Sequence, residues 1–238
     1  MKKFFLSPLF AILFTLFCMV CYYGISYAFY WKYGLFDIEK IGVTDTLTYL
    51  FYGIAFGIVI SLYHDFINSK KINTYCLLLF LWFIALLREM GIQHWLAVND
   101  TTAIKIKYFK NPQVPLYAKV TSALFIIGVI AVISYLLYKH LKQMIVGFFK
   151  FMPEYWTIAT FTGLGLLTQF ADRFPAHYRK TTGKMLSESI RFTLKILEEG
   201  GESILPLLFA VAFVQYHCRY KKICQNAGES KAIVQEHF

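Results

Sequence analysis

Three carboxylates, Glu198, Glu199 and Glu202, surround a pair of glycines just before an apolar run that continues to Val214. A carboxylate in hydrocarbon costs roughly 2.5–3.5 kcal/mol on insertion scales, so these groups must face a protein interior, a water-filled cavity, a cation or solvent. Because they crowd one another, one of them is expected to hold its proton unusually well and to suit acid–base work. The stretch therefore predicts a site at the mouth of a membrane segment.

A second polar group lies near the end of the apolar run 74–95 and contains Arg88 and Glu89. These are the first ionisable residues inside a hydrophobic segment, and such residues need partners. We interpret Glu89, together with Glu198 and Glu202, as a candidate catalytic residue of a lipid-modifying hydrolase or transferase.

Two histidines and an aspartate could assist such a reaction through a metal ion. His94, His177 and Asp172 offer imidazole and carboxylate ligands, a mixture that suits a divalent metal such as zinc. Neither an H-E-x-x-H nor an E-x-x-H pattern is present, so the spacing gives no specific support to this metal site.

Basic residues near the carboxylates could hold the phosphate of an anionic lipid or a lipid-linked headgroup. The substrate-binding candidates are Arg88, Arg173, Lys105 and Lys107. The same charges are also open to a non-catalytic interpretation, in which they form a structural network that docks a partner protein. Proton-coupled transport is a third interpretation of the crowded carboxylates.

The composition places these residues in a membrane protein. Of 238 residues, 58% are hydrophobic and 19% are aromatic, too apolar for an ordinary soluble domain. The net charge of +10 is a signal of membrane topology and indicates anionic membrane lipids as partners. No nucleic-acid-binding module is recognisable. The signatures of lipid phosphatases, rhomboid proteases and disulfide-bond oxidoreductases are absent, and the sequence resembles no family that we recognise.

Hydrophobic runs of about 20 residues predict an all-α, polytopic transmembrane helical bundle of about six spanning helices. A single domain is expected over 1–218, followed by a short polar cytoplasmic tail over 219–238. The expected spans are 4–30, 46–63, 74–95, 119–138, 156–170 and 203–217.

Turn formers and charges set the expected boundaries. A separate interfacial amphipathic helix is predicted over 139–152, stopped by Pro153, and the stretch 171–175 is expected to close the fifth span. Gly53 and Gly57 form a G-x-x-x-G pattern, which we interpret as ordinary helix packing inside the bundle.

Location and orientation follow from the charges. The composition is typical of a multi-pass protein of a bacterial inner membrane, and the first hydrophobic run is expected to remain as a helix rather than to be cleaved. Lysines directly before that helix favour cytoplasmic placement of both termini. This topology would bring the candidate site residues to the outer face.

Overall fold

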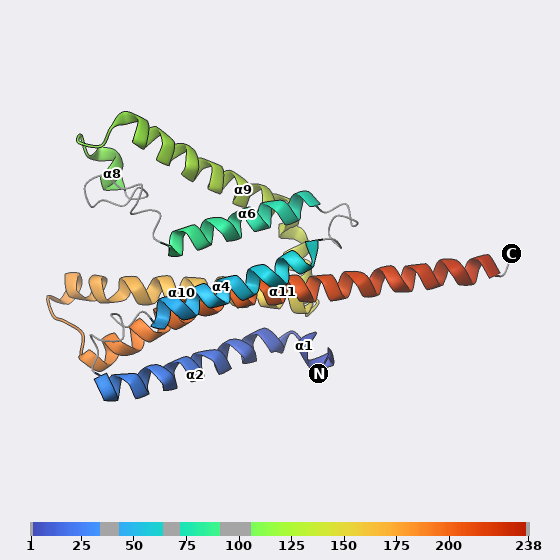
Figure 1. Cartoon of the computed structure of the whole chain (residues 1–238), viewed down its shortest axis with the longest axis horizontal. Helices are drawn as coiled ribbons and strands as arrows, with labels where there is room; N and C mark the ends of the chain where they lie inside the picture. Colours follow the sequence, from blue (N-terminus) through green and yellow to red (C-terminus); the bar gives the residue numbers. More distant parts are fainter. Residues whose placement is uncertain (1, 34–42, 64–71, 91–105, 237–238) are drawn as a thin grey trace. The chain divides into compact units, whose positions relative to one another are not determined.

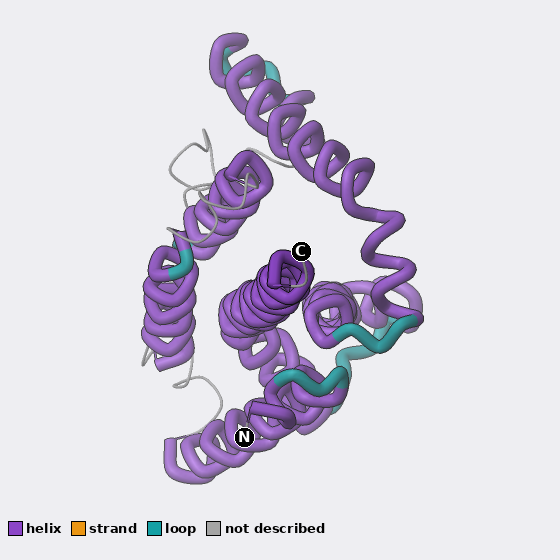
Figure 2. Tube along the Cα trace, turned by 90° about the vertical axis from the view of Figure 1, so that its right-hand side faces the viewer, coloured by secondary structure: helices purple, strands orange, loops and turns teal. Residues whose placement is uncertain are grey.

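The computed structural model describes residues 2–33, 43–63, 72–90 and 106–236. Within these ranges the chain forms helices and connecting loops, and no strand occurs (Figure 2). The predicted all-α class is therefore confirmed for the described residues. The helices are α1 (Lys2–Phe5), α2 (Leu9–Tyr33), α4 (Val43–Ser61), α6 (Ile72–Glu89), α8 (Ile106–Lys110), α9 (Leu116–Phe149), α10 (Pro153–Thr182) and α11 (Glu188–Glu236).

These helices fall into two compact units. The first unit comprises Met1–Tyr63 and Val146–Phe238, and the second comprises His64–Ile145. Figure 1 shows the elements of both, coloured along the chain. Each unit is described by itself below.

In the first unit, α11 is the central helix, because α10, α4 and α2 all pack against it. Helices α2 and α10 also pack against each other. Their apolar core is built from Ala11 of α2, Leu164 of α10, and Ile204 and Leu208 of α11, all nearly inaccessible to solvent. The segment of α11 that follows the carboxylates is thus the centre of this unit.

In the second unit, side-chain hydrogen bonds join the start of α6 to α9. Lys139 Nζ donates to Thr74 Oγ1 at 3.2 Å, and His140 Nε2 lies 3.4 Å from the same hydroxyl. A small apolar cluster around Tyr108 and Val114 joins α8 to the start of α9.

Three of the helices are long and apolar enough to cross a membrane, namely Leu9–Ala28 within α2, α6 and α9. The apolar part of α4, Thr46–Ser61, is shorter. The expected spans 156–170 and 203–217 lie inside α10 and α11, which do not belong to this group of three. Long apolar helices are therefore confirmed for three of the six expected spans, and a bundle of six spans stays a prediction.

The separate interfacial helix predicted over 139–152 is wrong. Residues 139–149 continue α9 without a break, because nothing between Tyr138 and Phe149 interrupts helical hydrogen bonding. Pro153 does not stop a helix but starts α10, where its missing N–H costs nothing and its fixed φ suits the first turn.

The stretch 171–175 does not end the helix, since Pro175 lies inside α10, and the end of the fifth span at 170 stays a prediction. The helix ends instead at Gly183, which adopts a left-handed φ of 68° and donates its N–H to the carbonyl of Arg179. Glycine occupies this conformation without the steric cost that a side chain would bring. Helix α10 therefore extends further than the hydrophobic pattern indicated.

Candidate functional site

The acidic stretch of α11 carries its own counter-ion. Lys195 Nζ lies 2.7 Å from Glu199 Oε1 and 3.6 Å from Glu198 Oε2, which are its neighbours at i+4 and i+3 on the helix. Both carboxylates are half-buried, with side chains 28% exposed for Glu199 and 20% exposed for Glu198. One cation is thus shared by two acids, and Glu199 is the closer partner.

Lys195 lies farther from the Glu198 carboxylate than from the Glu199 carboxylate and neutralises its charge less completely. Burial raises its pKa above the ordinary value of 4.5, Lys195 lowers it, and repulsion from Asp172 and Glu199 raises it again. Since a raised folded-state pKa favours the protonated form, the group stabilises the fold fully below its unfolded pKa. This contribution is lost as the pH rises through the folded pKa.

Two amide variants are expected to distinguish the contribution of the Glu198 carboxyl to stability from that of the Glu199 carboxyl. Glu198→Gln should unfold at the same or a higher temperature than the parent chain at neutral pH, because it removes a buried charge that Lys195 neutralises only in part. Glu199→Gln should lose up to about 1 kcal/mol, because it removes the closer partner of Lys195. Thermal unfolding in detergent micelles from acid to neutral pH measures both. A Glu198→Gln protein that keeps the full pH dependence would contradict this assignment.

The glycine pair lets two helices approach α11 beside these acids. A Cβ at Gly200 would lie 2.7 Å from a ring carbon of Tyr22 on α2, and one at Gly201 would lie 2.3 Å from Thr168 Cγ2 on α10. The G-x-x-x-G pattern shows no such approach, since a Cβ at Gly53 or Gly57 would meet no described atom within 4 Å. Close packing therefore occurs at Gly200 and Gly201 and not at the predicted pair.

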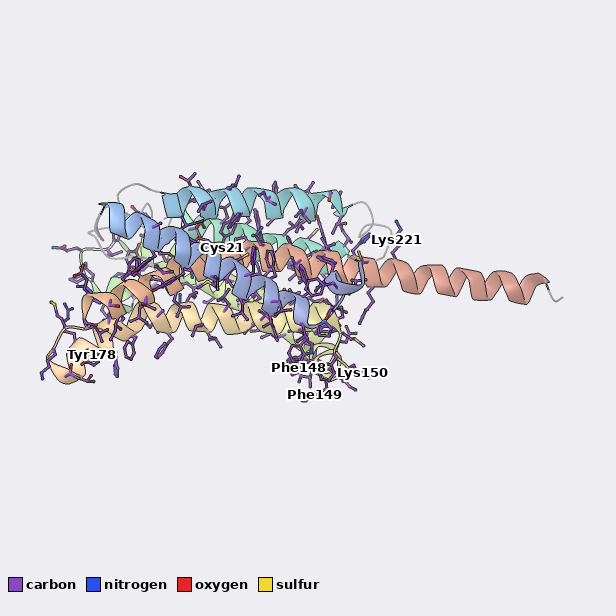
Figure 3. The ribbon with its side chains drawn as sticks, turned by 90° about the horizontal axis from the view of Figure 1, so that it is seen from below. Cys21, Phe148, Phe149, Lys150, Tyr178 and Lys221 are labelled. Carbon is purple, nitrogen blue, oxygen red and sulfur yellow. The ribbon has the colours of Figure 1, made fainter. Side chains whose placement is uncertain are left out.

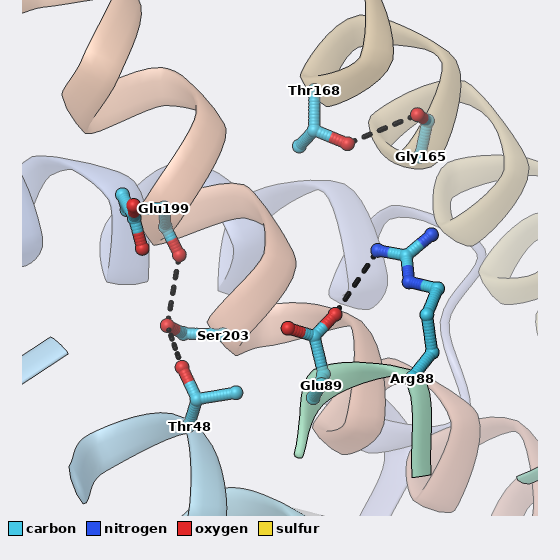
Figure 4. Close-up of polar contacts among 7 residues, drawn as sticks. All are labelled: Thr48, Arg88, Glu89, Gly165, Thr168, Glu199 and Ser203. Carbon is cyan, nitrogen blue, oxygen red and sulfur yellow. Dashed lines mark hydrogen bonds and ion pairs between the residues drawn. The ribbon is translucent and has the colours of Figure 1, made fainter. Parts of the chain in front are cut away.

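A hydroxyl pair joins α4 to α11 one turn after Glu199. Ser203 and Thr48 lie with their hydroxyl oxygens 2.7 Å apart, and Ser203 Oγ also donates to the carbonyl of Glu199 at 2.8 Å (Figure 4). Both side chains are buried, so these bonds supply the partners that a polar group needs away from water. The acidic stretch is held between α2, α4 and α10.

The predicted residues on α10 lie on its surface. Asp172, Arg173 and His177 are all exposed, and Asp172 is near enough to Glu198 to affect its charge. Glu202 is half-buried and has interactions of its own. Across the part of the chain that the structure describes, no group of three His, Cys, Asp or Glu side chains could hold a metal ion.

The remaining predicted residues belong to the second unit. Arg88 Nη2 contacts Glu89 Oε1 at 3.0 Å at the end of α6, so these neighbours form an ion pair (Figure 4). Lys107 lies in α8, but the structure does not describe its side chain. His94 and Lys105 lie outside the described residues. The convergence of Glu89 with the α11 carboxylates therefore stays a prediction.

Sequence reasoning missed a buried ion pair between α10 and α11. Glu154 is 1% exposed, and its Oε1 lies 2.7 Å from Arg219 Nη1. The guanidinium carbon also lies 5.9 Å from the centre of the Tyr155 ring, a favourable position for a cation over an aromatic face. The available signal was a lone carboxylate directly after the proline that starts α10.

A buried amide reinforces the same region. Gln215 Oε1 accepts a hydrogen bond from Thr157 Oγ1 at 2.6 Å, and Gln215 Nε2 donates to the carbonyl of Phe5 at 2.9 Å. These bonds connect α11 to α10 and to α1. The beginning of the chain and the stretch of α11 around Arg219 therefore lie at one end of the first unit.

The opposite end of α10 is basic. Arg179, Lys180 and Lys184, which we call the hairpin cations, surround the Gly183 cap between α10 and α11, and all three are exposed. Met185 follows them and is 72% exposed. Figure 3 shows Tyr178 at this end of the unit, away from Phe148 and Lys150 at the other. None of the ion pairs among the described residues engages a hairpin cation.

Comparison with known proteins adds no further assignment. No family model, curated protein or solved structure matches this chain.

Proposed function

We propose that this chain is an integral membrane protein that binds an anionic lipid or a lipid-linked headgroup at the hairpin cations. The observation that carries the proposal is the cluster of exposed basic side chains beside the exposed Met185 at the end of α10. Cations at a membrane surface attract phosphate-bearing headgroups, and an exposed methionine suits the adjoining acyl region. Glu198 and Glu199 form their ion pairs with Lys195 and not with the hairpin cations.

In this proposal six helices cross the membrane, with α4, α10 and α11 added to the three long apolar ones. Glu199 and Arg219 mark the polar ends of a stretch of about 20 residues of α11, which is about 30 Å long and equals the hydrocarbon thickness. Polar groups inside that stretch have partners within the protein, as Ser203 and Gln215 show. Internal hydrogen bonds allow such helices to be less apolar than helices that face lipid on all sides.

The proposed location is a bacterial inner membrane with both termini on the cytoplasmic side. The bond from Gln215 to Phe5 places the N-terminal helix at the same end of the first unit as Arg219. Lys2 and Lys3 directly precede the first hydrophobic run at this end, and lysines beside the first membrane helix favour its cytoplasmic placement. The hairpin cations then face the outer leaflet.

The binding proposal is tested with the triple variant Arg179→Gln, Lys180→Gln and Lys184→Gln. Native mass spectrometry of the full chain, titrated with phosphatidylglycerol, should show at least about tenfold weaker retention of the lipid, because each cation near an anionic surface contributes about 1 kcal/mol. The difference should shrink at high salt. Circular dichroism should remain unchanged, since all three side chains are exposed.

The matched control removes three other exposed lysines, through Lys110→Gln, Lys142→Gln and Lys221→Gln. It makes the same change in net charge and should retain phosphatidylglycerol more tightly than the hairpin triple variant. Equal losses in the two triple variants would mean that the lipid follows net charge alone, and the proposed site would be withdrawn.

A second candidate function is a non-catalytic membrane subunit that docks a partner protein through a charge network. It is favoured by the pairing of predicted catalytic acids with neighbouring bases, Lys195 with Glu198 and Arg88 with Glu89. Purification of the chain from its native membrane discriminates the two candidates. A stoichiometric protein partner without retained anionic lipid would favour docking, and retained lipid without a partner would favour headgroup binding.

A further inference from the structure

The turn between α9 and α10 exposes two phenylalanines on either side of a lysine. Phe149 is 74% exposed, Phe151 is 64% exposed, and Lys150 between them is exposed as well. Figure 3 shows Phe148, Phe149 and Lys150 together at the end of the first unit opposite Tyr178. Large aromatic rings at a loop tip lose favourable burial if they face only water, so their exposure requires an explanation.

The turn is a built structure. The ring of Trp156 stacks on those of Phe148 and Phe151, with centroid distances of 4.7 and 5.5 Å and interplanar angles of 15° and 13°. Trp156 Nε1 also donates a hydrogen bond to the carbonyl of Phe148 at 3.0 Å. The stack fixes the direction in which Phe149 and Lys150 project.

Phe151 adopts a backbone conformation that bulky residues rarely take. Its φ is +53°, in the left-handed region, and it is the one non-glycine residue with positive φ among the described ranges. Such a conformation costs energy and persists only where its surroundings hold it, as the stack on Trp156 does here. This strained conformation occurs in a turn whose exposed side chains are aromatic and basic.

We propose that residues 148–152 form an interfacial anchor that inserts into the headgroup region of an anionic leaflet. The rings of Phe149 and Phe151 enter the boundary between headgroups and acyl chains, and Lys150 pairs with lipid phosphate. Aromatic rings concentrate at this depth in membrane proteins, and lysines near it attract anionic lipid. The anchor differs from the hairpin cations in its residues and lies at the other end of α10, so either proposal can fail without the other.

The anchor is tested by measuring its depth. The full-length Phe149→Trp variant is reconstituted in vesicles of phosphatidylcholine and phosphatidylglycerol, and its added fluorescence over the parent chain is quenched with brominated lipids. Lipids brominated near the headgroup should quench this added signal more than lipids brominated near the chain ends, since interfacial residues lie about 5–10 Å below the surface. Phe149 is not stacked on Trp156, and an indole at position 149 can keep the edge contact that Phe149 makes with Phe148 at a centroid distance of 5.7 Å, so the substitution preserves the turn.

A variant in the middle of a membrane helix calibrates the depth scale. Cys21 is exposed on α2 within the apolar stretch Leu9–Ala28, and Cys21→Trp should be quenched most by bromines near the chain ends. If the added signal of Phe149→Trp shows that same deep profile, or responds only to an aqueous quencher, the anchor proposal is overturned.

The anionic preference has its own measurement. Brominated phosphatidylglycerol should be enriched around Trp at position 149 by about fivefold over brominated phosphatidylcholine, the factor expected for one lysine near the surface. Adding Lys150→Gln should abolish most of this enrichment while leaving the depth profile unchanged. An enrichment that is absent from the start, or that survives Lys150→Gln, would refute the role given to Lys150.

Discussion

Replacing Arg219 by methionine is expected to lower the free energy of unfolding by about 3 kcal/mol. The substitution leaves the Glu154 carboxylate, which is only 1% exposed, without its ion-pair partner, and breaking a buried pair from one side typically costs about 3–5 kcal/mol. The lower end applies because the Arg219 side chain is 32% exposed and water screens part of the interaction. Denaturant unfolding in mixed micelles, followed by circular dichroism, measures the loss.

The double variant Arg219→Met with Glu154→Gln is the control, because it removes both charges and leaves no uncompensated ion. It should recover much of the lost stability, since neutral replacements of buried pairs are often well tolerated. Arg219→Lys keeps a cation near Glu154 and should lie between the parent chain and Arg219→Met. If Arg219→Met unfolds like the parent chain, the pair contributes nothing to stability.

The sequence predicted element types better than element ends. Hydrophobic runs identified α2, α6 and α9, because a run of about 20 apolar residues has few alternatives to a membrane helix. Pro153 and Pro175 misled the boundary prediction: proline is as well suited to begin a helix as to end one, and packing can hold it inside one. Gly183 is the actual terminator, in a left-handed conformation that caps the helix after the basic residues of its last turn.

The candidate site was predictable only in part. The crowding of Glu198, Glu199 and Glu202 is visible in the sequence, and an unusual proton affinity of one of them was expected. Burial is the main reason that the Glu198 pKa is raised, and burial requires knowledge of the neighbouring helices. The Glu154–Arg219 pair joins two residues far apart in the chain, with no spacing that signals their contact.

Substituting Gly201 by alanine is expected to destabilise the first unit by about 1–3 kcal/mol, the usual cost of adding a methyl group to a filled space. The new Cβ would lie 2.3 Å from Thr168 Cγ2 and 3.4 Å from Leu164 Cδ1, so α10 and α11 would have to separate. Thr168 is 1% exposed and β-branched, which leaves it little freedom to move aside. The loss should appear as a lower unfolding temperature of the reconstituted or detergent-solubilised protein.

Gly163→Ala on α10 provides a control of opposite sign, because no atom lies within 4 Å of the added Cβ. Alanine favours a helix over glycine by about 0.8–1.0 kcal/mol, so this variant should be more stable than the parent chain. Gly201→Ala receives the same helix-propensity gain, and its net loss would therefore understate the steric cost at the α10–α11 contact. If both alanine variants stabilise the protein, then Gly201 is not needed for the close packing of α10 against α11.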